Sequence, residues 1–318
     1  MKDQKISKVT EKIGRSEMRT AIKNSGYLME QRIFPIMEEE GYYVETNPVY
    51  PDPFTDKARE YDFSAITAKK LFREDFDFLY THLIGECVNN SQPIVFFTSE
   101  TPIDFLFHED IKCAGIPLYF PENSEDNSEV SFQDYFHLEK FHHYCHGIYS
   151  TQYCSFKLKS KKPEWMAWHD EEHHSVFNSL IEATRYTVKE FFSEWVPPEE
   201  DEEEPVNLNL FYPVLIIRDD LYECKQTKRQ FSLRKKNHLQ FRKSAISSKG
   251  RETYQVDVIV ESYLPKFLSI LDEEALSLKR RLARKKKLVR EAVDRIVEKA
   301  NKEKSQNKSK TYKDVLEF

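Results

Sequence analysis

The most regular alternation of apolar and polar positions lies between residues 59 and 92. Apolar and polar side chains alternate over residues 61–66, which is typical of a half-buried strand. After a polar, turn-prone segment, the apolar run of residues 78–88 predicts a second strand, which ends in a polar segment. Two adjacent strands that each carry an acid near one end can bring the two carboxylates together, here Asp62 and Glu86.

A helix is predicted before these strands, starting at Ser25. Gly41 is a natural C-terminal stop for this helix. Pro35 lies inside the window and predicts either a kink or an early end near Phe34. The apolar face of the helix consists of Met29, Ile33, Ile36 and Met37.

The rest of the pattern predicts further strands and one long internal helix. The segment 221–224 is expected to return antiparallel beside residues 209–217, because a polar turn separates the two. Residues 101–162 are irregular and aromatic-rich, and they predict no definite architecture. The remaining strands are expected at residues 42–50, 94–98, around Phe241 and at 254–260. The helix is expected over residues 164–195, with a buried stripe of His173, Phe177, Leu180, Thr184, Val188 and Phe191.

A second long helix is predicted from Leu264 onward. Its apolar positions are spaced alternately by three and four residues, and only Lys285 interrupts them. This spacing is typical either of a helix that docks on the protein core or of a coiled-coil seam in a homodimer. The apolar positions are Leu271, Ala275, Leu278, Leu282, Val289, Ala292 and Ile296.

The composition narrows the functional classes. A chain of 318 residues with 23 Phe and 17 Tyr can bury a sizeable core. Its 7 Gly and the lack of Gly-rich phosphate motifs argue against a dinucleotide or P-loop fold. Five Cys without a CxxC pair argue against a zinc ribbon or a disulfide framework. Because the chain has neither an apolar leader nor an 18-residue apolar run, we expect a soluble, cytoplasmic protein that does not associate with membranes.

Asp62 and Glu86 are the leading candidates for chemistry. Paired carboxylates suit Mg²⁺, and Mg²⁺ suits phosphodiester chemistry. The stretch resembles the restriction-endonuclease-like, or PD-(D/E)xK, nuclease superfamily, in which an Asp on one strand is followed by Glu/Asp-x-Lys on the next. Glu30 matches a further Glu that this family often carries on the upstream helix. The resemblance covers residues 25–98 well, but Val88 stands at the position of the family's lysine.

The resemblance implies an α/β protein with a restriction-endonuclease-like core of helix, mixed β-sheet and helix. It also implies Mg²⁺- or Mn²⁺-dependent cleavage of DNA, with Asp62 and Glu86 as metal ligands and Glu30 assisting. The expected division of the chain is an N-terminal arm (1–24), the nuclease-like domain (25–263) with an insertion (101–162) and an acidic linker (199–204), a C-terminal helix (264–300) and a polar tail (301–318).

Val88 leaves two alternatives open, because valine cannot orient or polarise an attacking water. The role of the lysine can have moved to another side chain, for which the candidates are Lys57, Lys69, Lys70, Asn89, Asn90 and Gln92. Alternatively, the domain has lost catalysis and keeps the fold to bind nucleic acid or a protein partner.

Cationic residues are concentrated in two blocks, although the net charge of the chain is −6. Residues 225–251 contain ten Lys and Arg and no acid, and a second block covers residues 279–287. Such clusters bind nucleic-acid phosphates without sequence preference. We therefore expect DNA, or alternatively RNA, as a partner. The expected contacts are Lys228, Arg229, Arg234, Lys235, Lys236, Arg242 and Lys243.

Three further motifs are weaker candidates. His169 and His173 share a helix face, but Asp170 stands where the zinc-protease pattern needs Glu, so partly buried structural histidines are expected. The cluster His142-His143-Tyr144-Cys145-His146 has metal-ligand side chains but no second ligand pair at a usable spacing. The literal Glu-x-Lys of Glu223-Cys224-Lys225 lies too close to the preceding acids to build the nuclease site.

Overall fold

The structure is a computed structural model that describes residues 12–52, 55, 57–72, 76–102, 107–121, 128–159, 163–169, 171–193, 198, 203–247 and 250–306. Most of the predicted acidic linker, residues 199–202, and the last part of the predicted tail, residues 307–318, lie outside these ranges.

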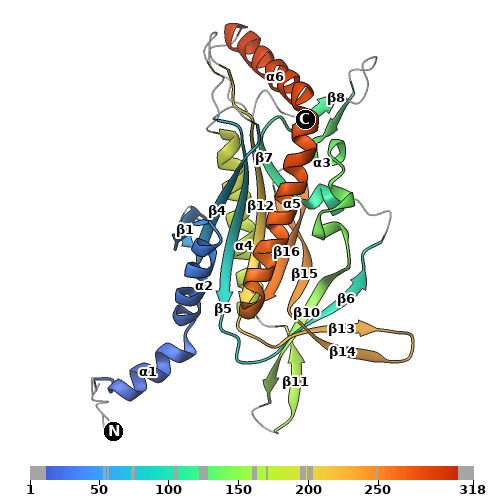
Figure 1. Cartoon of the computed structure of the whole chain (residues 1–318). Coiled ribbons are helices and arrows are strands. Elements are labelled where there is room, and N and C mark those ends of the chain that lie inside the picture. Colours follow the sequence, from blue (N-terminus) through green and yellow to red (C-terminus); the bar gives the residue numbers. More distant parts are fainter. Residues whose placement is uncertain are drawn as a thin grey trace.

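Within the described ranges, twelve strands form one mixed sheet (Figure 1). Ten of them follow one another across the sheet in the order β1 (Tyr43–Thr46), β4 (Phe63–Lys70), β5 (Phe78–Val88), β12 (Asn207–Ile217), β16 (Gly250–Val260), β15 (His238–Ser247), β10 (Ile148–Leu158), β6 (Ile94–Glu100), β13 (Leu221–Gln226) and β14 (Phe231–Lys236). In addition, β7 (Lys112–Ile116) pairs with β12, and β11 (Trp165–Trp168) pairs with β10.

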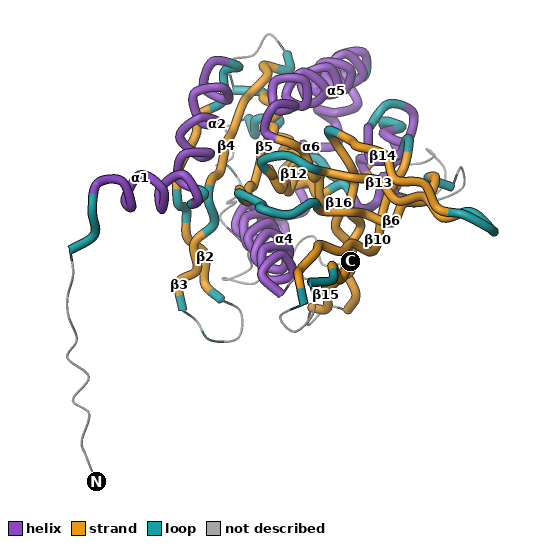
Figure 2. The backbone as a smooth tube through the Cα atoms, turned by 90° about the horizontal axis from the view of Figure 1, so that it is seen from below, coloured by secondary structure: helices purple, strands orange, loops and turns teal. Residues whose placement is uncertain are grey.

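Helices cover both faces of the sheet (Figure 2). Two small hairpins complete the fold, β2 (Val49–Pro51) with β3 (Ala58–Glu60) and β8 (Tyr119–Pro121) with β9 (Glu129–Ser131). None of the described helices combines the length and the apolar character needed to cross a bilayer. The α-helices of the described chain are α1 (Arg15–Asn24), α2 (Tyr27–Glu39), α3 (Phe132–Tyr135), α4 (Glu171–Ser193), α5 (Leu264–Arg284) and α6 (Lys286–Gln306).

The core forms two layers, one on each side of the central strands. Helices α2 and α5 pack on one face and α4 packs on the other. Strand β12 lies between parallel neighbours β5 and β16, and nearly all of its side chains are buried. A strand that is covered on both faces becomes almost continuously apolar, which explains the run of residues 214–217.

The first helix ends where its sequence predicts. Helix α2 ends at Glu39, and Gly41 adopts a φ of +83°, a conformation that glycine tolerates without strain. Met29, Ile33 and Met37 are buried as expected. Pro35 does not end the helix, which continues for a further turn.

The C-terminal stripe is a docking surface within the same chain. Its members from Leu271 to Ala292 are buried against the core, and Ile296 packs against it partly exposed. The interruption at Lys285 corresponds to a break that divides the predicted single helix into α5 and α6. Helix α6 extends to Gln306, beyond the predicted boundary at residue 300.

Two predictions of local structure are wrong. The helix expected from residue 164 begins only at Glu171, because residues 165–168 form β11 at the edge of β10. The segment after β12 does not turn back beside it, because β5 and β16 already occupy both edges of β12. Instead, β13 crosses the sheet and pairs parallel with β6 and antiparallel with β14.

Candidate functional site

The antiparallel pair β4–β5 places the two predicted acids at the same end of the sheet. Phe63 pairs with Gly85, so Asp62, one residue before Phe63, and Glu86, one residue after Gly85, lie across from each other at the same end of the two strands. Asp62 Oδ2 accepts a hydrogen bond of 2.7 Å from the backbone amide of Cys87. Any side chain at Gly85 would collide with the ring of Phe63, because its Cβ would lie 1.9 Å from a ring carbon. This close packing fixes the register that brings the carboxylates together.

The surroundings of the acids come from both helical layers. A hydrogen bond links Glu86 to Ser179 of α4, and Ser179 Oγ lies 3.2 Å from the hydroxyl of Tyr50. On the opposite layer, Glu30 lies in the first turn of α2. Glu30 and Asp62 influence each other electrostatically, as do Asp62 and Glu86. The structure therefore brings together the three acids that the sequence singles out.

The pKa values of all three carboxylates are raised, and neighbouring carboxylates contribute at Glu30 and Glu86. Burial, followed by the charges of Asp62 and Glu30, raises the pKa of Glu86 to about 8, although its hydrogen bond to Ser179 opposes the shift. Burial raises the pKa of Asp62, and burial and Asp62 raise that of Glu30. Among the described side chains, no Lys or Arg lowers any of these pKa values. The site thus concentrates acidic groups whose pKa values are not lowered by any cation of the described chain.

The position that corresponds to the lysine of the PD-(D/E)xK motif holds Val88, which contributes only an apolar surface. Val88 packs partly buried against the core on the α4 side. Lys69 lies seven residues after Asp62, about 23 Å away along the strand at ~3.3 Å per residue, and it pairs with Asp272 of α5. Lys70, which pairs with Phe78, lies at the same far end of the hairpin. Neither lysine can therefore replace the missing one at the carboxylates.

Among the other candidates for the lysine role, the two asparagines have structural partners and Lys57 is exposed. Asn89 Nδ2 donates to the carbonyl of Ser25 at 3.0 Å. Asn90 Nδ2 donates to the backbone carbonyls of Gln92 and Asp219 at 3.0 and 2.8 Å. Lys57 is exposed before β3.

Arg59, which precedes Asp62 by three residues, also has another role. Arg59 forms an ion pair with Asp52, and its charge lowers the pKa of Tyr50 rather than that of the three acids.

A second titratable cluster connects the motif of residues 142–146 to distant strands and to α5. His143 Nδ1 lies 2.9 Å from Glu274 Oε1, and His143 Nε2 lies 3.1 Å from Asp257 Oδ1. His238 Nε2 approaches the same Asp257 oxygen at 2.7 Å, and the Tyr144 hydroxyl donates to Asp257 Oδ2 at 3.1 Å. Nothing in the local sequence reveals these partners, because Asp257 and Glu274 lie more than a hundred residues away along the chain.

This histidine cluster has the residue types of a metal centre, and most of its polar atoms join one network of hydrogen bonds and ion pairs. Within the described chain, His142 Nε2 and Glu274 Oε2 are buried without a hydrogen-bond partner. Two groups in the described chain have possible ligand atoms within 4.8 Å of one another, His142–His143–Glu274 and His143–His238–Asp257. His142 Nδ1 accepts from the Tyr144 amide at 3.2 Å, so the ring proton lies on Nε2, 3.7 Å from Glu274 Oε2. A metal at that nitrogen would have to displace this proton. Glu30, Asp62 and Glu86 do not form such a compact group of three.

The predicted phosphate contacts fall into three environments. Lys228 and Arg229 lie at the exposed turn of the β13–β14 hairpin, and Arg234 is exposed on β14; Figure 1 shows this hairpin projecting from the body of the sheet. Lys235 pairs with Asp219 and Asp220, Lys236 with Glu223 and Arg242 with Asp110. Lys243 lines a pocket on the α4 side.

The rival motifs lie away from the three acids. Lys225 pairs with Glu100 at 2.6 Å, which leaves the literal Glu-x-Lys at the opposite part of the sheet. His169 packs against the ring of Tyr153, with ring centroids 4.7 Å apart, whereas the side chain of His173 lies outside the described part of the chain.

The α4 residue that holds Glu86 was not predicted. Ser179 lies at a position of an amphipathic helix where any polar residue is expected, so its role becomes visible only in three dimensions. Comparison with known proteins adds no further information: no family model, no curated protein and no solved structure matches this chain.

Proposed function

We propose that the protein is a metal-dependent nuclease that cleaves DNA phosphodiester bonds, with RNA as the alternative substrate. The observation that carries the proposal is the meeting of Glu30, Asp62 and Glu86, whose pKa values are raised with no Lys or Arg among the causes. Sites that bind divalent cations through oxygen ligands have this character, because the protein concentrates negative charge that only the cation neutralises.

The topology around the acids supports a restriction-endonuclease-like core. The order is helix α2, the antiparallel pair β4–β5 with the acids at one end, then α4 on the opposite face, and β12 parallel to β5. This is the sequence of helix, mixed sheet and helix that the resemblance of residues 25–98 implies.

The donor set fits Mg²⁺ or Mn²⁺ held chiefly by two carboxylates. Mg²⁺ retains several waters and takes one or two carboxylates together with substrate phosphate oxygens, so a compact group of three protein ligands is not required. Asp62 and Glu86 would hold the ion and Glu30 would assist from α2. A bound ion supplies charge neutralisation at the phosphate and lowers the pKa of water.

The chain's own residues hold the acids in place. The Cys87 amide fixes one oxygen of Asp62, and Ser179, next to the Tyr50 hydroxyl, orients Glu86. Val88 can neither donate nor accept a proton, so no proton transfer passes through the usual lysine position. Asp62 and Glu86 would therefore provide both the metal binding and the orientation of the phosphate.

Asp62→Ala is expected to reduce metal-dependent nicking of supercoiled plasmid by about 100-fold or more. Loss of a group that only orients a ligand already costs ~10- to 100-fold, and Asp62 is proposed as a ligand itself. Cleavage should be measured with Mg²⁺ and with Mn²⁺ on plasmid, linear and single-stranded DNA and on RNA. Glu60→Gln, at an exposed position of β3, is the matched control and should cut as the wild type does. Undiminished cutting by the Asp62→Ala variant would remove Asp62 from the site.

A second function is favoured by Val88 and by the finding that no Lys or Arg of the described chain lowers the pKa values of the acids. On this alternative the protein is a catalytically inactive nuclease fold that binds nucleic acid through the β13–β14 hairpin. The exposed turn with Lys228 and Arg229 suits phosphate contacts, and a two-stranded β-ribbon fits the major groove of duplex DNA. Absence of any turnover with either metal, together with salt-sensitive DNA retention, would favour this alternative.

Replacing Lys228, Arg229 and Arg234 by alanine is expected to weaken DNA retention under both functions. Each lost phosphate contact should reduce the slope of log K against log salt by about 1, and therefore by up to about 3 for the triple variant. The measurement is fluorescence anisotropy with labelled duplex over a range of salt concentrations. A control with the same charge change is the replacement of Lys12, Arg15 and Arg19 by alanine in and before the exposed helix α1. Equal slopes for both triple variants would exclude the hairpin as the contact.

A further inference from the structure

The sheet splits between β10 and β15. These parallel strands pair only at Tyr149 with Gln240 and at Ser150 with Phe241, and no further pairing joins them in the part of the chain described. A bulge between Ser150 and Gln152 disrupts the other edge of β10, where it pairs with β6. The two strands therefore diverge towards their carboxyl ends, and such a crevice is a common place for a ligand in sheets with helices on their faces.

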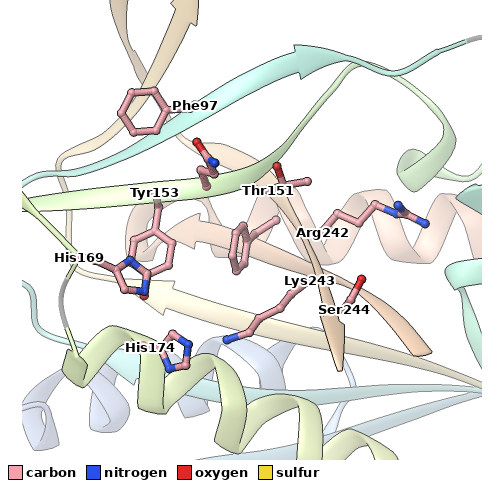
Figure 3. A pocket seen from close by; sticks show the side chains of 10 residues that line it. Phe97, Thr151, Tyr153, His169, His174, Arg242, Lys243 and Ser244 are labelled. Carbon is pink, nitrogen blue, oxygen red and sulfur yellow. The ribbon is translucent and has the colours of Figure 1, made fainter. Parts of the chain in front are cut away.

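A pocket of about 520 Å³ occupies this crevice on the α4 side (Figure 3). Buried rings of Tyr153 and Phe241 belong to its wall, while Thr151, Gln152 and Ser244 contribute exposed polar groups. Among the residues that the structure describes, none of those lining the pocket is acidic.

Basic nitrogens converge in the pocket, and no acid of the described chain lines it with them. Figure 3 shows Lys243 extending from β15 towards His174 of α4, with His169 beside Tyr153. The Lys243 ammonium lies 6.0 Å from the centre of the Phe177 ring, and within the described ranges it has no ion pair or hydrogen bond. Burial lowers the pKa of Lys243 to about 8, and the charge of Lys243 is the first cause that lowers the pKa of His174.

Within the described chain, Arg242, the residue before Lys243, is a partly buried cation that, in contrast to Lys243, has an acidic partner. Arg242 Nε donates to Asp110 at 2.7 Å, and its guanidinium lies 4.8 Å from the centre of the Phe107 ring. Figure 3 shows it pointing away from Lys243. Lys243 thus keeps a cation in the pocket at a cost in desolvation, whereas Arg242 is neutralised inside the protein.

We propose that the crevice between β10 and β15 binds a phosphate group, with Lys243 as its cationic contact and His174 as a neutral hydrogen-bonding contact. The polar groups of Thr151, Gln152 and Ser244 add neutral hydrogen bonds, and the exposed ring of Phe97 offers an aromatic surface at the edge of the pocket. The phosphate belongs either to a mononucleotide or to the backbone of a nucleic-acid strand, which share this chemistry.

This site goes beyond the proposed nuclease centre and is separate from it. Glu86 and Lys243 face the same α4 layer. They are separated by three strand spacings of ~4.8 Å across the sheet and by four residues of ~3.3 Å along the strand. Because these two directions are perpendicular, the distance between the residues is about 20 Å. At 3.4 Å per nucleotide this equals about six nucleotides along one strand of a duplex. A strand whose phosphate occupies the crevice would thus extend over the carboxylates only if it follows the α4 face of the sheet.

The test compares Lys243→Met with wild type in the full-length protein, with EDTA present so that no cleavage takes place. The probes are inorganic phosphate, adenosine monophosphate and a labelled oligothymidylate, measured by calorimetry and by anisotropy. We expect Lys243→Met to weaken the probe that binds by at least about tenfold, Lys243→Arg to retain most binding, and His174→Gln to weaken it to a smaller degree. Lys157→Met is the control, because that lysine lies over the Trp168 ring outside the pocket lining.

Each outcome decides the proposal. If phosphate and the mononucleotide bind in a manner that depends on Lys243, the site takes free ligands; if only the oligonucleotide does, the site takes a backbone phosphate. Because Lys243→Met removes a desolvated charge, its melting temperature at neutral pH should be equal to or above that of wild type, so weakened binding would not reflect unfolding. The proposal is wrong if no probe binds wild type, or if Lys243→Met binds every probe as wild type does.

Discussion

Asp257→Asn should destabilise the protein by about 3–5 kcal/mol, the loss typical of removing one partner of a buried ion pair. Asp257 on β16 is fully buried and accepts hydrogen bonds from three side chains, His143, His238 and Tyr144. An asparagine can accept through only one atom, and its amide group would face a donor. The substitution therefore leaves His143 charged or unpaired in the interior.

The charges of this cluster depend on one another. Burial alone would lower the pKa of His143, but Glu274 and Asp257 raise it to about 10. Burial alone would raise the pKa of Asp257, but His143 and His238 lower it well below its ordinary range. The cluster joins the η3 turn (His143–Cys145) to β15, β16 and α5 by charge as well as by packing.

The pH dependence follows from these directions. The stabilisation from His143 is complete below its ordinary pKa of 6.5 and disappears as the pH rises through about 10. The stabilisation from Asp257 is complete above its ordinary pKa of 3.8 and disappears as the pH falls below it. The cluster therefore contributes most between about pH 4 and 6.5.

Urea unfolding of wild type and Asp257→Asn across this pH range measures the effect. The matched control is Asp272→Asn on α5, whose exposed acid pairs with Lys69 and should cost no more than about 1 kcal/mol. If Asp257→Asn lost no more stability than the Asp272→Asn control, the cluster would not be an ionic connection within the core.

The sequence predicted those parts of the fold that short-range patterns determine. Alternation predicted β4, a continuous apolar run predicted β5, and the spacing of three and four residues predicted the buried stripe of α5. The pairing of Asp62 with Glu86 could be predicted from these two strands. In an antiparallel hairpin, a residue just before the first strand lies beside a residue near the end of the second. These features depend on neighbours within about thirty residues.

The sequence did not predict features that depend on which strands become neighbours. Strand β13 pairs with β6, which lies more than a hundred residues earlier, and nothing in the turn after β12 indicates that choice. The acids that hold His143 come from β16 and α5, so its motif looked incomplete. Lys243 belonged to a basic block in the sequence, but its pocket exists because β10 and β15 diverge.

Glu86→Gln should make the metal-free protein more stable at alkaline pH, by on the order of 5 kcal/mol, since each unit of pKa shift corresponds to about 1.4 kcal/mol. The pKa of Glu86 rises from an ordinary 4.5 to about 8, chiefly through burial and then through Asp62. The folded state therefore holds a proton that the unfolded state releases, and stability falls as the pH rises from about 4.5 to about 8. Glutamine keeps the shape but cannot ionise, so the variant should lack this decline.

Thermal and urea unfolding between pH 4 and 9 should show equal stability of wild type and variant at the acid end and a growing advantage of the variant above it. Glu60→Gln on β3 is the control and should follow wild type throughout. With Mg²⁺ or Mn²⁺ at 100 times its dissociation constant, wild type should gain about 2.7 kcal/mol, and Glu86→Gln should gain little. A variant that is less stable at alkaline pH without metal would mean that the Glu86 carboxylate has a favourable partner within the protein. The proposal of a metal site would then lose its main support, because an acid that is already neutralised needs no cation.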